Sequence, residues 1–425
     1  MTDLDKIEHI KRAMPVSGLF AGKMWRVSPS AFPLDAATVD YLEKLGPRLH
    51  AFLQAANLLY RKSYQGKAPA WIAEWLDLGK PRELVELSRS AAQKNTLPSI
   101  IRPDLLLADD GFALSEIDAV PGGIGLTAWL NETYAAVGEP VIGGASGMKD
   151  AARKNFPTGS VVISEEAADY RPEMEWLHGV KRVKEAEHYT FSGEPVYRFF
   201  ECFDWQNLPS LSASYTPAQP LNPPLKPFLE EKMWLALFWL KPLRQFWRQE
   251  LGDRYWRDLQ KIIPPSWVVE PTELPPTAVL PGLEAHSWRE VAAFSQKERA
   301  LVLKISGFSP LAWGSRGVTV GFDVSGSDWR AALESALAGF AQSPHIVQRF
   351  VKGKIVEHPY WDEPARTLTV MQGRARLCPY YFVEDNKATL KGVLATITPA
   401  DKKIIHGMTD AIIVPAKEKP KARNA

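Results

Sequence analysis

Apolar residues recur at helical spacing along two early stretches of the chain, Val39 to Tyr60 and Ala70 to Gln93. Such spacing predicts amphipathic helices. After Pro98 the pattern changes to short apolar runs around Asp109-Asp110-Gly111, which is typical of a hairpin turn. We therefore predict a mainly helical N-terminal region over residues 1–97, followed by the first strands of a sheet.

Short apolar runs of strand length continue along the rest of the chain, separated by helical patterns. This mixture predicts an α+β fold with mixed or antiparallel sheets and flanking helices. The strand-like runs lie at residues 160–163, 196–200, 301–304, 346–350 and 367–370.

Two proline-rich segments, residues 209–227 and 264–281, lie on either side of a stretch with helical spacing. We expect one long helix there, over residues 228–261. The pattern then predicts a central α/β region, a final compact unit and a disordered basic tail. Their predicted bounds are residues 98–285, 286–415 and 416–425.

Composition excludes several classes of protein. The 51 Lys and Arg residues nearly balance the 49 Asp and Glu residues, which argues against a nucleic-acid or membrane coat. Two cysteines, Cys202 and Cys378, cannot form a disulfide framework or a zinc ribbon. The apolar stretch from Met233 to Leu243 is about half of the roughly 20 residues that a membrane span needs. Since the first residues also lack an apolar signal segment, we expect a cytoplasmic protein without membrane contact.

The most informative residues are Arg102, Asp104, Glu116 and Asp118. With a three-residue turn at 109–111, Asp104 opposes Glu116 and Arg102 opposes Asp118, so all four side chains share one face. Three ionised carboxylates in one patch repel one another unless a cation lies among them. Because the ligands are oxygen atoms, we expect that cation to be Mg²⁺ or Mn²⁺.

Other interpretations of this region stay open. Acidic strand residues often form a solvated edge with one Arg–Asp ion pair, and a two-residue turn would make the four residues diagonal neighbours. The following run, Gly123 to Ala128, fits the loose GxGxxA pattern of dinucleotide-binding loops. However, such a loop follows a continuous apolar strand and not an acidic hairpin. We expect these glycines to allow a turn or a close approach of the backbone to a ligand.

A second candidate site combines a lysine with a glycine-rich loop. Lys304 ends an apolar strand, and loops rich in free backbone amides bind phosphates. The order differs from a Walker loop, in which the lysine follows the glycines. Gln348, on a later strand, could recognise an adenine edge, although both side chains also suit an ordinary strand end. The loop residues of interest are Gly314, Ser315, Arg316 and Gly317.

Tryptophans and basic residues alternate between Lys226 and Lys261, as on a stacking platform for single-stranded nucleic acid. Apolar residues at helical spacing in the same stretch instead favour a buried helix face with a solvated opposite face. No HExxH, GxSxG or Ser/His/Asp spacing indicates a hydrolase.

Taken together, these residues resemble the circularly permuted ATP-grasp family, in the arrangement of the ligase domain of glutathionylspermidine synthase and its uncharacterised bacterial relatives. Arg-x-Asp followed twelve residues later by Glu-x-Asn is that family's metal and phosphate motif. Here it stands as Arg102-Pro-Asp104 and Glu116-Ile-Asp118. The chain departs from the family at Asp118, where Asn is common. As in the family, these strands precede the lysine strand.

The resemblance implies roles for individual residues, with ATP and one or two Mg²⁺ ions, replaceable by Mn²⁺, as cofactors. Lys232 and Lys304 would contact phosphates, Gln348 would face the adenine, and the loop Gly314 to Gly317 would close over the phosphates. Arg102 would stabilise charge on the acceptor, and Arg374 or Arg376 would lie near the transferred phosphoryl group. The implied metal ligands are Asp104, Glu116 and Asp118.

The function implied is an ATP- and Mg²⁺-dependent carboxylate–amine ligase that forms a C–N bond through an acyl phosphate. Such chemistry requires no protein nucleophile. Its partners would be a small carboxylate and an amine, neither of which the sequence identifies, and the oligomeric state is equally open. Two alternatives are a catalytically silent nucleotide-binding regulatory protein and, less favoured, a single-stranded nucleic-acid-binding protein.

Overall fold

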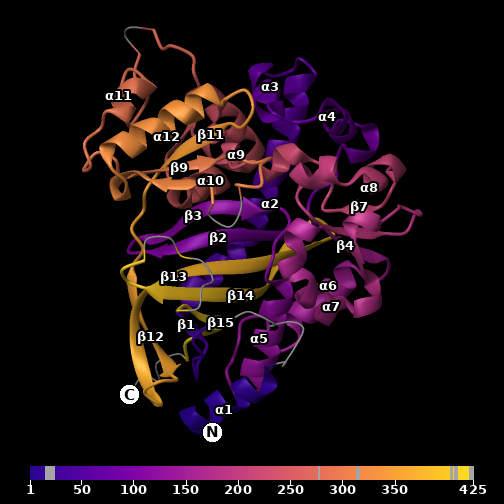
Figure 1. Cartoon of the computed structure of the whole chain (residues 1–425), viewed down its shortest axis with the longest axis vertical. Helices are drawn as coiled ribbons and strands as arrows, with labels where there is room; N and C mark the ends of the chain where they lie inside the picture. Colours follow the sequence, from indigo (N-terminus) through magenta and orange to yellow (C-terminus); the bar gives the residue numbers. More distant parts are fainter. Residues whose placement is uncertain (15–23, 276–277, 313–315, 403–404, 406–409, 421–425) are drawn as a thin grey trace. The chain divides into compact units, whose positions relative to one another are not determined.

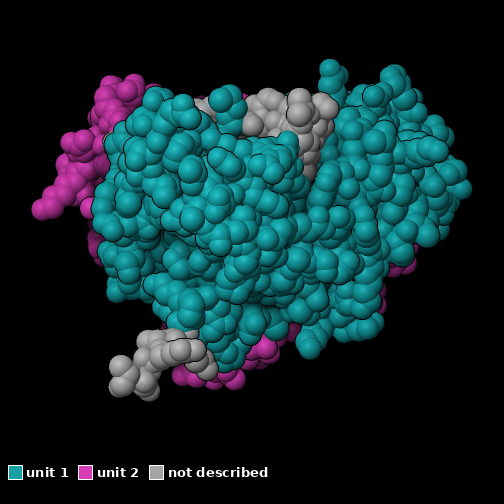
Figure 2. Space-filling model, turned by 90° about the horizontal axis from the view of Figure 1, so that it is seen from below, with its two compact units in different colours: residues 1–50, 96–224, 353–425 teal, residues 51–95, 225–352 magenta. Residues whose placement is uncertain are grey.

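The computed structural model describes residues 1–14, 24–275, 278–312, 316–402, 405 and 410–420. The chain forms two compact units, coloured separately in Figure 2. Unit 1 contains residues 1–50, 96–224 and 353–425, and unit 2 contains residues 51–95 and 225–352. The predicted segments 98–285 and 286–415 thus each contain residues of both units. The predicted α+β class is confirmed, because both units combine helices with β-sheets.

Within the described residues, unit 1 contains a seven-stranded sheet in the order β1-β15-β14-β13-β2-β3, with β12 paired to β13. Only the β1/β15 pair is parallel. The long strands β13 and β14 run through its centre (Figure 1), and β13 is buried on both faces from Leu377 to Phe382. The bounds are β1 Phe32–Leu34, β2 Ile100–Ala108, β3 Gly111–Asp118, β12 Ile355–Asp362, β13 Thr367–Glu384, β14 Lys387–Pro399 and β15 Ile412–Glu418.

A second, four-stranded sheet of unit 1 is parallel throughout, in the order β5-β4-β6-β7. Its buried strands β4 and β6 consist mainly of β-branched and aromatic residues, as expected for a covered parallel sheet. Helices and strands of this part are α5 Ile124–Ala136, α6 Gly147–Asn155, β4 Ser160–Ile163, α7 Arg171–His178, β5 Val183–Glu185, β6 Val196–Phe199, α8 Pro209–Ser214 and β7 Leu221–Asn222.

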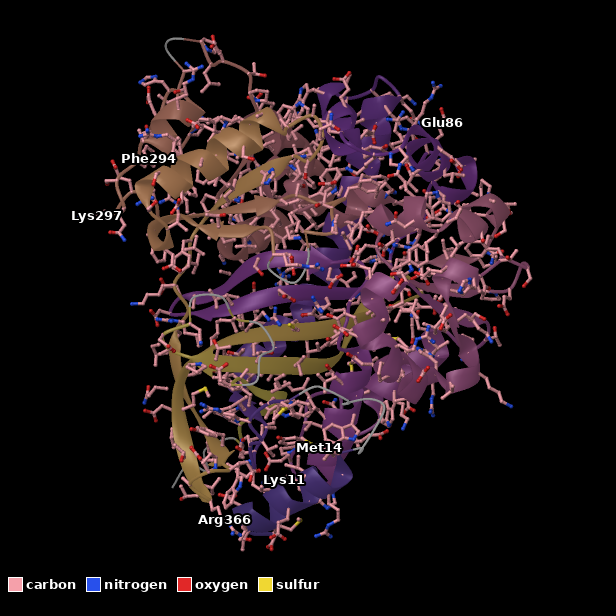
Figure 3. All side chains as sticks on the ribbon, viewed as in Figure 1. Lys11, Met14, Glu86, Phe294, Lys297 and Arg366 are labelled. Carbon is pink, nitrogen blue, oxygen red and sulfur yellow. The ribbon has the colours of Figure 1, made fainter. Side chains whose placement is uncertain are left out.

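The first helix, α1 (Asp3–Ala13), is fixed to unit 1 by ion pairs. Lys6 Nζ lies 2.7 Å from a carboxylate oxygen of Glu139, and the other oxygen of Glu139 binds Lys417 of β15. Lys11 pairs with Glu363 in the turn between β12 and β13, and Figure 3 shows Lys11 at the same end of the unit as Arg366 of that turn.

Strand β15 corrects the prediction of a disordered tail over residues 416–425. Residues 416–418 belong to β15 and pair with β1, and Ala416 is buried. Backbone pairing with β1 and the contact of Lys417 with Glu139 stabilise this segment, although its composition is polar. Residues 421–425 lie outside the described part of the chain.

Unit 2 contains a four-stranded antiparallel sheet in the order β10-β9-β11-β8. One face packs against α11 and α12 in a hydrophobic cluster that includes Trp267, Trp288, Leu303, Trp329 and Val347. Residues alternate between the two faces of a strand, so their sequence neighbours Lys304, Gln348 and Ser266 lie on the opposite face. The bounds are β8 Ser266–Val269, α11 Trp288–Ala292, β9 Leu301–Ile305, β10 Val318–Val320, α12 Gly326–Ala338 and β11 His345–Arg349.

The remaining helices of unit 2 correct the prediction of one helix over residues 228–261. The structure has two helices there, α9 (Met233–Leu237) and α10 (Arg244–Ile262), and α10 is interrupted at Gly252, where φ is +70°. Pro242 lacks the backbone N–H that a continuous helix would donate to the carbonyl oxygen of Phe238, and it lies in a short 3-10 helix, Lys241–Leu243, between α9 and α10. The N-terminal helices are α2 Ala36–Tyr64, which contains the boundary between the units, α3 Trp71–Asp77 and α4 Arg82–Ser88.

In the ranges that the structure describes, no helix combines the length and the apolar character needed to cross a bilayer.

Candidate functional site

The hairpin of β2 and β3 brings the four predicted residues together in unit 1. Arg102 pairs with Asp118, and Asp104 pairs with Glu116. The predicted three-residue turn is wrong, because Ala108 pairs with Gly111 and only two residues form the turn. A bulge between Asp104 and Leu105 on one strand, with Ser115 as the extra residue on the other, restores the register. The facing pairs therefore form for a different reason from the one expected.

Arginine–carboxylate ion pairs connect this hairpin to β13. Arg102 lies 2.7 Å from Asp118 and 3.1 Å from Asp104, and Arg376 of β13 lies 2.8 Å from the second oxygen of Asp104. The Cys378 thiol also contacts Asp104, at 3.3 Å. The side chain of Asp104 is only 2% exposed. Asp104 thus fixes two arginines from different strands.

The two arginines predicted to lie near the transferred phosphoryl group differ in their surroundings. Arg376 lies in the ion-pair cluster, whereas Arg374 donates hydrogen bonds to the carbonyl oxygens of Gly353, Ala400 and Lys402. Carbonyl contacts of this kind fix local backbone. Arg376 is therefore the better candidate of the two.

Electrostatics in the cluster favour an additional cation. Burial raises the pKa of Asp118, and the charges of Glu116 and Asp104 raise it further, although Arg102 opposes this. Burial opposes the ionisation of Arg102, but Asp104 and Asp118 hold its pKa well above the ordinary value. Two arginines thus share three carboxylates, and an ion beside Glu116 and Asp118 would relieve the remaining repulsion.

The carboxylate cluster fits a divalent ion only in part. No three His, Cys, Asp or Glu side chains of the described ranges lie close enough to hold a metal ion. Both oxygens of Asp104 contact Arg102, Arg376 or Cys378. Glu116 and Asp118 are only partly buried, on the edge strand β3, and carry the hard oxygen atoms that Mg²⁺ prefers.

Unit 2 places Lys304 and Gln348 together on the polar face of its sheet. Lys304 Nζ donates to Gln348 Oε1 at 2.8 Å, and Gln348 Nε2 donates to Ser266 Oγ at 3.2 Å. Lys304 is 8% exposed and Gln348 is 4% exposed. The amide expected to face an adenine is thus already hydrogen-bonded at both ends and orients the lysine.

Lys232 lies directly before α9 and donates from Nζ to the carbonyl oxygen of Ala312 at 2.7 Å. Its backbone N–H donates to the carbonyl oxygen of Ser306, two residues after Lys304. Arg316 is exposed, and Gly317 accepts a hydrogen bond from the backbone of Ile305. Gly314 and Ser315 lie outside the described residues. Lys232 therefore contacts the loop that follows the lysine strand.

Comparison with known proteins extends to solved structures only, since no protein-family model and no curated protein matches the chain. A glutathione synthetase-like effector from Globodera pallida, in its apo form, aligns with a TM-score of 0.53 at 9% identity, over 98% of this chain and 95% of that one. This chain shares its fold with that effector. A protein from Methylobacillus flagellatus KT, provisionally named gamma-glutamylcysteine synthetase, aligns with a TM-score of 0.40 at 13% identity, over 82% of this chain and 87% of its own.

The surroundings of the carboxylate cluster include residues that the sequence did not single out. Cys378 and Tyr380 follow Arg376 at intervals of two, so strand periodicity could have placed them on the same face. Tyr380 donates to the carbonyl oxygen of Gly122 at 2.8 Å, as Arg102 does at 3.0 Å. The ring of Tyr170 also packs against Gly122. A Cβ atom at position 122 would lie 2.3 Å from that ring, so a residue larger than glycine would displace Tyr170. No local pattern indicates Tyr170.

Three of the four tryptophans of the stretch 226–261 are buried and unavailable for stacking on a nucleic acid, and the fourth, Trp239, is partly buried. Trp234, Trp247 and Trp256 are buried in unit 2. The guanidinium groups of Arg244 and Arg248 lie over the ring of Trp256, 5.1 and 5.7 Å from its centre. This arrangement agrees with a buried helix face and a solvated basic face.

Proposed function

We propose that the chain is an ATP-dependent ligase that joins a small carboxylate to an amine through an acyl phosphate. The observation that carries this proposal is the register of the β2/β3 hairpin, which aligns Arg102 with Asp118 and Asp104 with Glu116 next to Arg376. The glutathione synthetase-like fold, which extends over 98% of the chain, supports the same class of reaction.

In unit 1, Asp104 acts as an anchor, because it is buried and binds both arginines. Arg102 then stabilises charge on the acceptor carboxylate, and Arg376 stabilises charge on the transferred phosphoryl group. Glu116 and Asp118 are the residues that would hold Mg²⁺ or Mn²⁺. When bound, the ion neutralises charge on the phosphates and orients them.

In unit 2, Lys304 and Lys232 bind the phosphates of ATP. The hydrogen bond from Lys304 to Gln348 fixes the ammonium group before a nucleotide arrives, which lowers the entropy lost on binding. We infer that Gln348 keeps this orienting role. It could contact adenine only by giving up its hydrogen bond with Lys304 or with Ser266. Lys232 exchanges the carbonyl of Ala312 for a phosphate oxygen.

The reaction has two steps. A carboxylate oxygen of the substrate attacks the γ-phosphorus of ATP, which gives an acyl phosphate and releases ADP. The amine nitrogen then attacks the acyl carbon, the C–O bond to phosphate breaks, and inorganic phosphate and a proton leave. The protein supplies position and opposite charge rather than a nucleophile.

The test measures nucleotide binding and turnover together. Titration calorimetry with ATP and Mg²⁺ should give saturable binding to the wild type, and mixtures of candidate acids and amines should be screened for ADP release. Glu116→Gln should weaken the Mg²⁺-dependent part of ATP binding by about tenfold or more, the scale of one lost charge contact. Asp110→Asn, in the exposed turn of the same hairpin, is the matched control and should bind as the wild type does. A wild type that binds no nucleotide would remove the proposal.

A second candidate is a nucleotide-binding protein without turnover. It is favoured by one observation, that both oxygens of Asp104 already contact Arg102, Arg376 or Cys378, while Asp118 stands where the family commonly has Asn. ADP release with any acid and amine pair would reject it. ATP binding without ADP release across the whole screen would favour it over the ligase.

A further inference from the structure

A buried ion pair in unit 2 involves a region without any chemical motif in its sequence. Lys80, between α3 and α4, lies 2.5 Å from Oε1 of Glu231, and the two side chains are 0% and 1% exposed. Isolated charges are costly to remove from water, so each residue requires the other. Glu231 directly precedes Lys232, the lysine proposed to bind phosphate.

Ser306 connects this ion pair to the lysine strand. Oε2 of Glu231 accepts a hydrogen bond from the Ser306 hydroxyl, which in turn accepts one from the backbone N–H of Met233 at 2.8 Å. The carbonyl oxygen of Ser306 accepts the backbone N–H of Lys232 at 2.7 Å. Residues 231–233 are therefore fixed against the end of β9, next to Lys304.

Glycine at position 307 makes this contact possible. A Cβ atom there would lie 2.9 Å from the carbonyl oxygen of Glu230 and 3.0 Å from Cδ of Glu231. Real Cβ atoms do not come this close to backbone, so a larger residue would push the two segments apart. The approach of Glu231 to the lysine strand is thus part of the packing of the unit.

We propose that Lys80 is a positioning residue for the phosphate chain of a nucleoside triphosphate, because it neutralises the buried Glu231 carboxylate beside Lys232. This inference rests on the proposed function. Without Lys80, the Glu231 carboxylate repels phosphate oxygens and competes with them for Lys232. With Lys80, the charge of the carboxylate is balanced. The hydrogen bond from Ser306, which a glutamine oxygen at position 231 can also accept, orders residues 231–233.

The proposal predicts opposite effects for the two members of the pair. Lys80→Met leaves an extra negative charge, and we expect ATP affinity to fall by about tenfold or more, with a smaller loss for ADP. Adenosine, which carries no phosphate, should bind within about twofold of its affinity for the wild type. Glu231→Gln removes the negative charge and should leave ATP affinity unchanged or higher, although it too breaks the buried ion pair.

The experiment is calorimetric titration of the full chain with ATP, ADP and adenosine in the presence of Mg²⁺. The double variant Lys80→Met/Glu231→Gln removes both charges, and it should recover ATP affinity to within a few-fold of the wild type. Lys80→Arg keeps the positive charge and should therefore retain most of the ATP affinity of the wild type. The control is Lys67→Met, an exposed lysine of the same segment, which should change nothing.

The results distinguish a charge-balancing role of Lys80 from a purely structural role. Equal losses for ATP and adenosine in Lys80→Met, or equal losses of ATP affinity in both single variants, would show a purely structural role and overturn the inference. So would a double variant that does not recover. If Lys80→Met does not fold, Glu231→Gln decides, because reduced ATP affinity there contradicts the proposal. A wild type that fails to bind ATP would overturn the proposed function and this inference together, whereas the other outcomes affect this inference alone.

Discussion

Cationic side chains of unit 1 and three lysines of unit 2 are stabilised in different ways, although unit 2 also contains the buried ion pair of Lys80 and Glu231. In unit 1, Arg102 and Arg376 contact the carboxylates of Asp104 and Asp118, and Glu139 contacts two lysines. In unit 2, Lys304, Lys226 and Lys232 donate to the neutral oxygens of Gln348, Asn57 and Ala312. A carboxylate cancels the charge of its partner, whereas an amide or carbonyl oxygen stabilises an ammonium group through its dipole alone.

Two buried ionisable groups, one in each unit, respond to pH in opposite directions, because a carboxyl group is neutral when protonated and a lysine is neutral when deprotonated. Burial and neighbouring carboxylates raise the pKa of Asp118 in unit 1, so its folded form gains stability as the pH falls through that raised value. Burial lowers the pKa of Lys226 in unit 2 to about 7, so its folded form gains stability as the pH rises above that value. In both units burial disfavours the charged form.

The largest effect is expected from a substitution that removes a negative charge from the ion-pair cluster of unit 1. Asp104→Asn leaves the guanidinium groups of Arg102 and Arg376 without the carboxylate that they share, and removing one partner of a buried ion pair typically costs about 3–5 kcal/mol. We expect a loss of this size in the free energy of unfolding, measured by urea denaturation. Asp110→Asn, in the exposed turn, is the control and should change it by less than about 0.5 kcal/mol. A loss below about 1 kcal/mol for Asp104→Asn would show that the arginines do not depend on this carboxylate.

The next effect concerns Lys226, which is 2% exposed and donates to Asn57 at 2.7 Å. Burial lowers its pKa to about 7, and the charge of Arg61 acts in the same direction. Between pH 7 and the ordinary lysine value of 10.5, the unfolded chain holds a proton that the folded chain releases, so stability rises with pH.

Lys226→Met should abolish this rise. Relative to the variant, the wild type should gain stability between pH 7 and pH 9, with a slope of at most about 1.4 kcal/mol per pH unit. Urea denaturation at three pH values measures it, and Lys241→Met, which alters an exposed lysine, is the control. Parallel pH profiles for the wild type and Lys226→Met would contradict the assigned pKa.

The carboxylate cluster could be predicted because its residues are close in sequence. Arg102 to Asp118 form one hairpin, so strand alternation and a turn are enough to place four side chains on one face. The predicted turn was wrong, because Asp109-Asp110-Gly111 suits turns of more than one length. The bulge at Ser115 has no marker in its residue type, since it depends on how the hairpin twists against β13.

The polar network of unit 2 could be predicted only in part, for the same physical reason. Lys304 and Gln348 stand out by their strands, but their hydrogen bond joins residues 44 positions apart, and the pair of Lys80 and Glu231 joins residues 151 positions apart. Local periodicity carries no information on such contacts. The predicted helix over 228–261 was wrong for a simpler reason, because apolar residues keep their helical spacing on both sides of Pro242 and hide the break that this single residue causes.

The smallest expected effect concerns the bulge at Ser115 in the β2/β3 hairpin. With the two-residue turn kept, deletion of Ser115 removes the extra residue of the bulge, and Asp104 still opposes Glu116. Urea denaturation should therefore show a loss of less than about 1 kcal/mol. Deletion of Ala113 shortens the same strand by one residue but moves the buried Leu114 to the other face and Ser115 into its place. That control should cost about 2–5 kcal/mol, as for other losses of a buried leucine, and equal losses for the two deletions would contradict the bulge as the source of the register.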